Sequence, residues 1–235
     1  MSASSLVIAS RFHGPEGSAN GGYFAGCVAV RAGRTVTVRL LRPPPLDTPL
    51  DAVELADGTL AVMAGTERCG EARSARLELQ PPVAPNYFQA VEASRHYAGF
   101  KYHRFPTCFV CGTARSREDG MRIFAGPIAE RGLVAAPWVP DASLDQGDGK
   151  VRPEFMSAVL DCPGFYAVSP DDRMMLLGEL TVHVNRLVHV GERCTVIGWA
   201  LEAASGRKHA AGTAVFDEDG DVCGLARALW IERKG

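Results

Sequence analysis

Residues 37–42 read Thr-Val-Arg-Leu-Leu-Arg and residues 181–186 read Thr-Val-His-Val-Asn-Arg, so the second half of the chain repeats a stretch of the first. A second match follows in the same order, since residues 69–74 read Cys-Gly-Glu-Ala-Arg-Ser and residues 223–228 read Cys-Gly-Leu-Ala-Arg-Ala. Two ordered matches predict one module used twice, whereas solenoid repeats are shorter and more numerous. Chance similarity is the alternative, because each match is short. Two fused modules can share one site at their junction, and each is then free to lose a different part of it.

The composition predicts a globular protein without a nucleic-acid or membrane partner. The 235-residue chain is 46% hydrophobic and 22% charged, enough for one large domain or two small ones with buried cores. A net charge of −2 and a pI of about 6.3 provide no basic surface for nucleic acid. The sequence start lacks the features of a signal peptide, and no apolar run approaches the roughly 18 residues of a membrane span. The seven cysteines, an odd number in a long chain, fit free thiols in the cytoplasm.

The first half predicts a short strand, a buried helix and an antiparallel meander. Asn20 can cap the helix by accepting a backbone N–H bond, residues 23–30 are largely apolar, and Gly33 can end it. Asp57-Gly58 is a strong signal for a two-residue hairpin. The expected strands of this half cover residues 6–12, 35–42, 51–56, 59–66 and 71–79.

A proline-containing linker with an expected helix over residues 86–98 precedes the second half. There the order of strand, helix and meander recurs, with a helix over residues 153–168 that Pro163 should kink or shorten. The expected strands of this half cover residues 107–111, 120–125, 131–136, 176–188, 193–203, 207–217 and 222–232. The predicted units are an N-terminal module of residues 1–80, a linker of residues 81–104 and a C-terminal module of residues 105–235.

Three motifs carry a resemblance to a known superfamily. The run Cys108-Phe109-Val110-Cys111-Gly112, followed by Gly120-Met121-Arg122-Ile123, looks like the opening strand of many small hotdog thioesterases. Asn20-Gly21-Gly22 resembles the His-Gly-Gly at the start of the hotdog helix, and Leu160-Asp161 resembles the carboxylate site further along that helix. The chain is similar to double-hotdog proteins of the thioesterase-like superfamily, which are related to acyl-CoA thioesterases. The resemblance implies an α+β fold of two tandem hotdog modules, each a long helix wrapped by a curved antiparallel sheet. The order of elements alone does not require it, because other α+β meanders share that order.

Asp161 is the first candidate for chemistry. It is a lone carboxylate among apolar residues of the second helix, and burial would raise its pKa and suit it to act as a general base or nucleophile. The resemblance implies that such a carboxylate activates water or attacks the thioester carbonyl itself. The alternative is a solvated helix residue, or a cap at a break before Pro163. Glu154 is the second candidate, although a carboxylate at a helix start more often stabilises the helix dipole.

The predicted substrate-binding residues are Asn20, Gly21 and Gly22, together with Tyr23 directly after them. Unpaired N–H groups at a helix N-terminus point outward, and glycine lets a substrate carbonyl approach the backbone closely. An oxyanion hole for a thioester carbonyl needs both properties. An ordinary capped helix with a glycine turn is the alternative.

The two halves lack complementary parts of the family's site. Where the family places the base after its glycine pair, the first half has Ala29 or Val30, which cannot act. Where the family places the glycine pair, the second half has Pro153, which has no N–H. We therefore expect one composite site per chain. The alternative is that both sites have decayed and the protein only binds.

Thr181 and His183 are further candidates, because they alternate on the strand after the second helix and share one face. The resemblance implies that polar partners of the carboxylate lie on strands near the helix. The alternative for His183 is an ordinary sheet residue.

Cys108 and Cys111 form a CxxC pair, with His103 shortly before it. A structural zinc site needs four ligands and no second close pair exists in the sequence, so no metal is expected. Packing in a strand is the expected role of both thiols. Packing is also expected for Cys162, which lies beside Asp161 without a histidine nearby in sequence.

The sequence thus predicts a cytoplasmic hydrolase of an acyl-CoA or related thioester that needs no cofactor and holds its acyl chain in an apolar tunnel between helix and sheet. A non-catalytic double-hotdog protein that binds an acyl group or another small apolar ligand is the main alternative. A hotdog hydratase or dehydratase is a lesser one, because no aspartate is followed by histidine at the spacing of those enzymes. Pairing of two double hotdogs into a homodimer is a further expectation.

Overall fold

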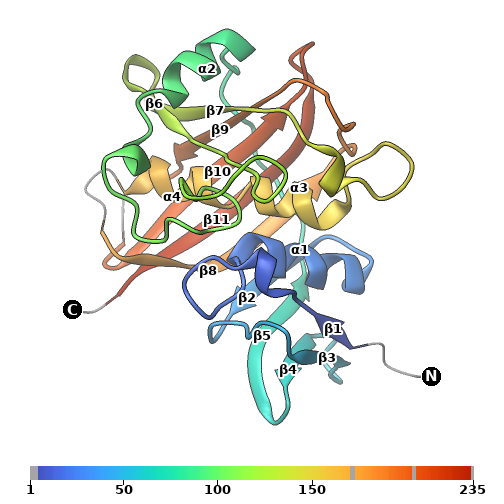
Figure 1. Cartoon of the computed structure of the whole chain (residues 1–235). Coiled ribbons are helices and arrows are strands. Elements are labelled where there is room, and N and C mark those ends of the chain that lie inside the picture. Colours follow the sequence, from blue (N-terminus) through green and yellow to red (C-terminus); the bar gives the residue numbers. More distant parts are fainter. Residues whose placement is uncertain (1–4, 170–172, 203–204, 234–235) are drawn as a thin grey trace.

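One antiparallel sheet runs through the whole molecule (Figure 1). The structure is a computed structural model of the chain and describes residues 5–169, 173–202 and 205–233. The strands, in the order in which they lie side by side, are β1 (Leu6–Val7), β3 (Pro49–Glu54), β4 (Leu60–Ala64), β5 (Glu67–Ser74), β2 (Val36–Leu40), β8 (Met175–Val184), β11 (Val222–Glu232), β10 (Lys208–Phe216), β9 (Cys194–Ala200), β7 (Leu133–Trp138) and β6 (Gly126–Ile128). The helices are α1 (Gly21–Ala32), α2 (Tyr87–Ser94), α3 (Pro153–Val159) and α4 (Cys162–Val168).

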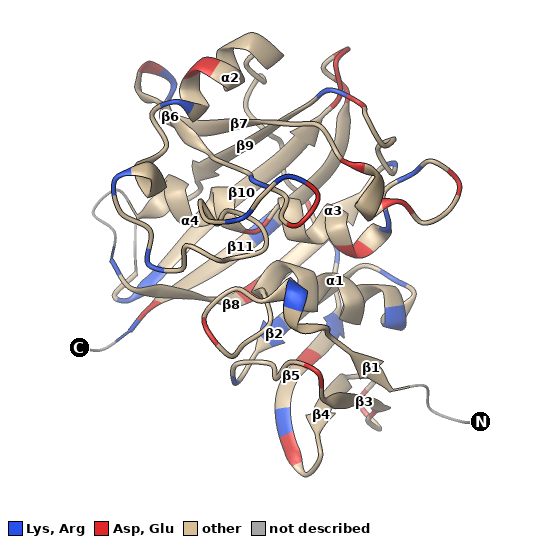
Figure 2. Ribbon diagram, viewed as in Figure 1, with Lys and Arg blue, Asp and Glu red and all other residues tan. Residues whose placement is uncertain are grey.

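The helices cover both faces of the sheet. α1, α3 and α4 lie together on one face, where they enclose the main hydrophobic core (Figure 1). α2 packs on the other face of the sheet, at the β6–β7 end. Successive side chains of a strand point to opposite faces, and in β9 Val196 belongs to the main core while Ile197 belongs to the core beneath α2. Basic and acidic residues are interspersed over the elements (Figure 2). No helix in the described part of the chain is long and apolar enough to cross a membrane.

The two halves of the chain meet where β2 pairs with β8. Thr37 faces Thr181 in this pair, and their side-chain oxygens are hydrogen-bonded at 2.6 Å. These are the first residues of the two repeated stretches. When equivalent residues of an antiparallel pair face each other, a local two-fold axis passes between them. The repeat in the sequence therefore corresponds to a local symmetry at the centre of the sheet.

The same hydrogen bonds recur beside each of these strands. After β2, the N–H groups of residues 41–42 both donate to the carbonyl of Cys69, at 3.0 and 3.2 Å. After β8, the N–H groups of residues 185–186 both donate to the carbonyl of Cys223, at 2.8 and 3.2 Å. Cys69 and Cys223 begin the second pair of matched stretches. The matched sequences thus form matched backbone structure.

α1 begins and ends where the sequence predicts. The Asn20 side chain accepts the Tyr23 N–H at 2.9 Å, which caps the first turn. Gly33 adopts a φ of 65°, which glycine tolerates readily, and its N–H bonds to the carbonyls of Ala29 and Val30. A hairpin around Asp57-Gly58 is found as the β3–β4 connection. Its turn is longer than the two residues expected, because Glu54 faces Leu60 and the Leu55 N–H donates to the Thr59 carbonyl at 2.8 Å.

The second predicted helix is divided into α3 and α4 by a break at Leu160 and Asp161. Pro163 has no N–H to continue the helical pattern, and the Gly164 N–H bonds instead to the Asp161 carbonyl at 3.0 Å. The Leu160 carbonyl is left without a helical donor and accepts the Thr213 hydroxyl of β10 at 2.7 Å. The break is therefore stabilised by the sheet beneath it.

The strands predicted over residues 107–111 and 120–125 are wrong. Cys108 to Gly112 form a tight turn, closed by the bond from the Gly112 N–H to the Cys108 carbonyl at 2.9 Å. Phe109 and its neighbours are apolar because this loop packs into the main core, where the rings of Phe109 and Phe12 lie 5.0 Å apart, edge to face. The apolar pattern reported burial correctly but not backbone conformation. The first predicted strand is also shorter than expected, because a 3-10 turn occupies residues 10–12.

Candidate functional site

The Asp161 side chain is the centre of a site that draws on both halves of the chain. It lies at the break between α3 and α4 and is only 2% exposed. Its Oδ2 accepts the side-chain amide of Asn20 at 2.9 Å and the backbone N–H of Gly22 at 3.0 Å. The carboxylate of the second half is thus held by the N-terminus of α1 in the first half.

Asn20 uses both ends of its amide group. Its oxygen caps α1 by accepting the Tyr23 N–H, and its nitrogen donates to Asp161. Its backbone is fixed as well, because the Asn20 N–H donates to the Phe12 carbonyl at 2.8 Å. The residue that caps the start of α1 therefore also supplies a donor to the buried carboxylate.

Gly22 is required by the close approach of the two halves. A Cβ at this position would lie 2.4 Å from the Asp161 Cβ and 2.9 Å from the Ser157 carbonyl oxygen. One turn later, a Cβ at Gly26 would lie 2.7 Å from the backbone of Glu154. The two glycines thus let α1 and α3 touch through their backbones, and only Gly22 bears directly on the carboxylate.

Burial raises the pKa of Asp161 to about 7. The Gly22 N–H and the Asn20 amide lower it, but these two donors offset only part of the desolvation. The other carboxylate oxygen, Oδ1, is buried and has no hydrogen-bond partner among the described residues. A carboxylate with one oxygen fixed, one free and a pKa near neutrality is suited to proton transfer.

A cavity of about 870 Å³ adjoins this carboxylate. Its wall includes Asp161, Asn20 and Gly21, and the Gly21 N–H makes no hydrogen bond within the described part of the chain. Much of the wall is apolar, from Leu40, Phe105, Phe165, Met175, Leu177 and Trp230. Three carboxylates and five arginines also line the cavity. The arginines are Arg42, Arg104, Arg173, Arg207 and Arg233. The cavity therefore combines an apolar interior with a positive charge balance.

Three cysteines also line the cavity next to Asp161: Cys108, Cys111 and Cys162. Cys108 lies close to the carboxylate's donor, with the Asn20 amide nitrogen 3.8 Å from its sulfur. The three thiols lie close enough together to hold a metal ion. A second such group contains Glu192 and Asp217, but both of these carboxylates bind the Arg186 guanidinium.

The structure does not bring the remaining predicted site residues to this cavity. Tyr23 is a core residue whose ring stacks on Phe12 at 4.2 Å. Glu154 lies at the α1–α3 contact and pairs with Arg152 at 3.2 Å.

Thr181 and His183 point away from the helices. Their neighbour Leu180 belongs to the main core, and side chains alternate between the faces of a strand. Thr181 lines a shallow groove on the outer face with Thr37 and Arg227, and His183 is exposed. Neither can reach Asp161 through the sheet.

Sequence reasoning missed Thr213 and Gly26. A threonine in an apolar strand and a glycine within a helix carry no sequence signal of their own, because their roles depend on what packs against them.

The solved structure of the tesB protein of Mycobacterium avium subsp. paratuberculosis aligns with 98% of this chain and 91% of its own, with a TM-score of 0.62 at 14% sequence identity. A thioesterase superfamily protein aligns with 48% of this chain, which spans only 57% of that protein (18% identity, TM-score 0.44). The Escherichia coli PaaI protein of the phenylacetic acid degradation operon aligns with 43% of this chain and 76% of its own (12% identity, TM-score 0.40). No protein-family profile and no curated protein matches the sequence.

The likeness to the tesB protein shows a shared fold over nearly the whole chain. The large antiparallel sheet with short helices is consistent with a hotdog fold. The resemblance read from the sequence is therefore confirmed at the level of fold.

Proposed function

We propose that the chain is a tandem pair of hotdog modules, residues 1–80 and 105–235 joined by the linker 81–104, with one composite site that hydrolyses a thioester. The proposal rests on the two hydrogen bonds that the Asn20 side-chain amide and the Gly22 N–H donate to Asp161 beside the cavity. The donors come from one module and the carboxylate from the other, so the site needs both. A cytoplasmic location and a homodimer of such chains stay predictions.

Asp161 acts as the general base in this proposal. Its Oδ2 is fixed by two donors, and the buried Oδ1, which has no partner among the described residues, accepts a proton from a water molecule that enters from the cavity. The water oxygen attacks the thioester carbonyl, the carbon–sulfur bond breaks, and the departing thiolate takes the proton from Asp161. The products are a carboxylic acid and a thiol. Direct attack of Oδ1 on the carbonyl, followed by water, is the alternative route with the same residue.

The Gly21 N–H is the donor available to the developing oxyanion. Gly22 and Asn20, which were expected to serve this purpose, donate to Asp161 instead. Gly21 lies at the cavity wall without a hydrogen-bond partner among the described residues, and it carries no side chain that would block a carbonyl. One unpaired donor at a helix N-terminus supports transition-state charge.

The cavity fits an acyl thioester of a phosphorylated carrier. Its apolar wall suits an acyl chain, and its five arginines suit the phosphates of coenzyme A. An acyl-CoA is therefore the substrate class that we propose.

Thiol release from short, long and aromatic acyl-CoAs tests this function. Asp161→Asn should lower kcat/KM by roughly 100- to 10,000-fold, because it removes the base. Glu154→Gln is the matched control, because this carboxylate lies in the same half but outside the cavity. Product acid should be measured by chromatography, since the seven cysteines of the protein react with thiol reagents. Turnover that survives Asp161→Asn, or that Glu154→Gln abolishes, would contradict the assignment.

A non-catalytic acyl-binding protein is the second candidate. It is favoured by the fact that two of the expected oxyanion donors are taken up by Asp161. In that case acyl-CoA would raise the melting temperature without any release of acid or thiol.

The hydratase alternative finds no support at the cavity. His103 lines it, but its Nδ1 accepts the Phe105 N–H at 3.0 Å and its Nε2 bonds the Cys111 carbonyl at 3.0 Å. Both ring nitrogens are thus engaged with backbone groups.

A further inference from the structure

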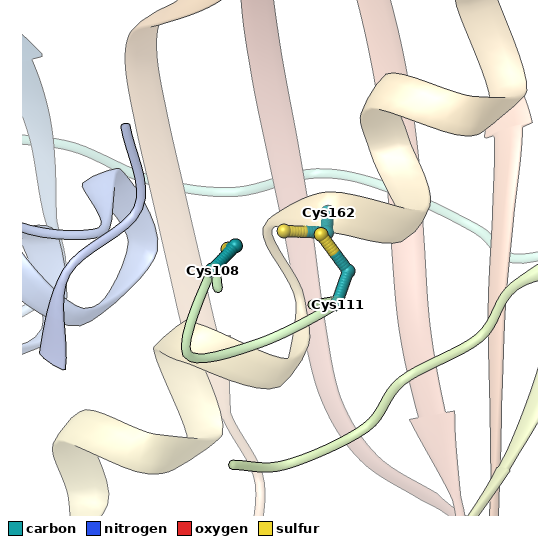
Figure 3. A group of neighbouring side chains, drawn as sticks. All are labelled: Cys108, Cys111 and Cys162. Atoms are coloured by element: carbon teal, nitrogen blue, oxygen red, sulfur yellow. The ribbon is translucent and has the colours of Figure 1, made fainter. Parts of the chain in front are cut away.

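The thiols of Cys108, Cys111 and Cys162 meet in the wall of the cavity. Cys108 and Cys111 lie on the loop before β6, and Cys162 is the first residue of α4 (Figure 3). Their sulfur atoms all lie within 4.8 Å of one another. Each of the three residues is 4–7% exposed, and all of them line the cavity. This is a group of soft ligand atoms, closed on the protein side and open on the cavity side.

The spacing suits a tetrahedral metal ion. Zinc binds thiolate sulfur at about 2.3 Å, which places two sulfurs of one tetrahedron roughly 3.8 Å apart. Sulfurs within 4.8 Å of one another therefore need only a small inward rotation to reach that geometry. Thiolate ligands also select zinc and copper(I) over magnesium and calcium.

The backbone holds the three thiols in place before any ion binds. The turn of Cys108 to Cys111 is closed by the Gly112 N–H bond to the Cys108 carbonyl. Gly112 cannot be replaced without a shift, because a Cβ there would lie 2.5 Å from that carbonyl oxygen. Cys162 is fixed by the helix break, which Thr213 stabilises from the sheet. Two segments with independent supports thus converge on one point.

Other buried cysteines of the chain show what ordinary packing looks like. Cys69 directs its thiol to the Val62 carbonyl at 3.4 Å, and Cys223 directs its thiol to the Asp221 carbonyl at 3.7 Å. Each of them satisfies its S–H with a backbone oxygen. The three clustered thiols face one another instead, which favours a ligand role over simple packing.

We propose that Cys108, Cys111 and Cys162 bind one Zn²⁺ ion, with its fourth coordination position directed to the cavity beside Asp161. Three protein ligands and one open position are the arrangement of zinc sites that engage an exogenous ligand. Here the exogenous ligand would be a water molecule or the thiolate of a small molecule that occupies the cavity. The sequence could not reveal the site, because the third cysteine joins the pair only through the fold. The proposal does not depend on thioester hydrolysis, and its test uses no acyl substrate.

The test is metal binding by the intact, reduced and chelator-treated protein. Zn²⁺ titrated in competition with a chromophoric chelator should fill one site per chain, and Co²⁺ should give thiolate-to-metal charge-transfer absorption. Each of the single substitutions Cys108→Ser, Cys111→Ser and Cys162→Ser should weaken Zn²⁺ binding by more than about 100-fold, which exceeds the effect of losing a group that only contacts a ligand. Cys69→Ser is the matched control, since that thiol is buried elsewhere, and it should bind Zn²⁺ like the wild type.

A second measurement covers the case in which the serine variants do not fold. In the wild type, Zn²⁺ should protect the three clustered thiols from slow alkylation, read by peptide mass spectrometry, and leave Cys27 unprotected. Equal labelling with and without Zn²⁺ would overturn the proposal, as would a wild type without charge-transfer absorption. A Cys108–Cys111 disulfide in protein that binds no metal after reduction would also overturn it and assign the pair a redox role.

Discussion

The helix of the first half is continuous, whereas that of the second half is broken. α1 runs for 12 residues from its Asn20 cap, while α3 and α4 have seven residues each and are separated at Leu160 and Asp161. The continuous helix offers N–H donors at its start. The broken helix places a carboxylate against those donors, at a point where a regular helix would have kept its backbone bonds.

This difference supports the proposal that two similar modules divide one site between them. The backbone bonds to Cys69 and Cys223 and the pairing of Thr37 with Thr181 keep the sheets of the two halves alike. The helices have diverged, since only one carries the donors and only the other carries the carboxylate. We infer that each half kept the part of the site that the other half lost.

The largest expected effect concerns the pH dependence of stability at the helix break. The folded-state pKa of Asp161 is raised to about 7, from 3.8. The group therefore contributes stability that is fully present below pH 3.8 and is lost as the pH rises through about 7. The Asp161→Asn variant has no such group. Its free energy of unfolding relative to the wild type should rise by roughly 4 kcal/mol between pH 4 and pH 8.

Urea unfolding of both metal-free proteins across this pH range measures that difference, and common titrations of other groups cancel in it. A difference that stays flat through pH 7 would show that Asp161 keeps an ordinary pKa. The same pKa predicts that kcat/KM for an acyl-CoA rises with pH through about 7, because the base must be ionised.

The second prediction disturbs the contact between the two halves. Gly22→Ala puts a methyl group 2.4 Å from the Asp161 Cβ, so the carboxylate must move and lose the Gly22 N–H. We expect kcat/KM to fall about 100-fold, as when a positioning group is displaced.

Gly26→Ala is the matched control for this change. It crowds the same helix pair at the Glu154 backbone, with no contact to Asp161, and should destabilise the protein by about 1–3 kcal/mol. Its kcat/KM should stay near that of the wild type. Equal losses of activity in both variants would mean that helix packing alone, and not the position of Asp161, decides activity.

A smaller effect is expected from the sheet side of the break. Thr213→Val leaves the buried Leu160 carbonyl without a donor, which should cost about 1–3 kcal/mol of stability. Thr195→Val in β9 is the control, because Thr195 is a largely buried strand residue whose side chain makes no hydrogen bond within the described part of the chain. Thermal unfolding of both variants compares their stabilities. Equal melting temperatures would show that the Thr213 hydrogen bond does not stabilise the helix break.

Much of the fold was predictable because local signals agree with it. The Asn20 cap, the Gly33 end and the Asp57-Gly58 hairpin each need only nearby residues, and all three are found, the hairpin with a longer turn than expected. The loop around Phe109 was mispredicted as a strand, because apolar alternation reports burial and a packed turn is buried as well. The break at Asp161 was foreseen from Pro163 as a kink or shortening of one helix, and as an alternative in which Asp161 caps a break.

The site was predictable in its parts but not in its contacts. Asn20, Gly22 and Asp161 were singled out from the sequence, yet the expected role of Gly22 was to face a substrate and not the carboxylate. Which donors meet which acceptor depends on the approach of α1 to α3, and Gly26 permits this approach without a sequence signal of its own. The convergence of Cys162 with the CxxC pair depends on the fold in the same way.

The most direct test of the composite site is a double-mutant cycle on kcat/KM for an acyl-CoA, with Asn20→Ser, Asp161→Asn and the double variant. Asn20→Ser keeps a side-chain oxygen that can cap α1, and it removes the amide that donates to Asp161. We therefore predict that Asn20→Ser slows the wild type by at least about tenfold but does not slow Asp161→Asn any further. Losses that multiply in the double variant would show that the two residues act independently, and would contradict a site shared between the two halves.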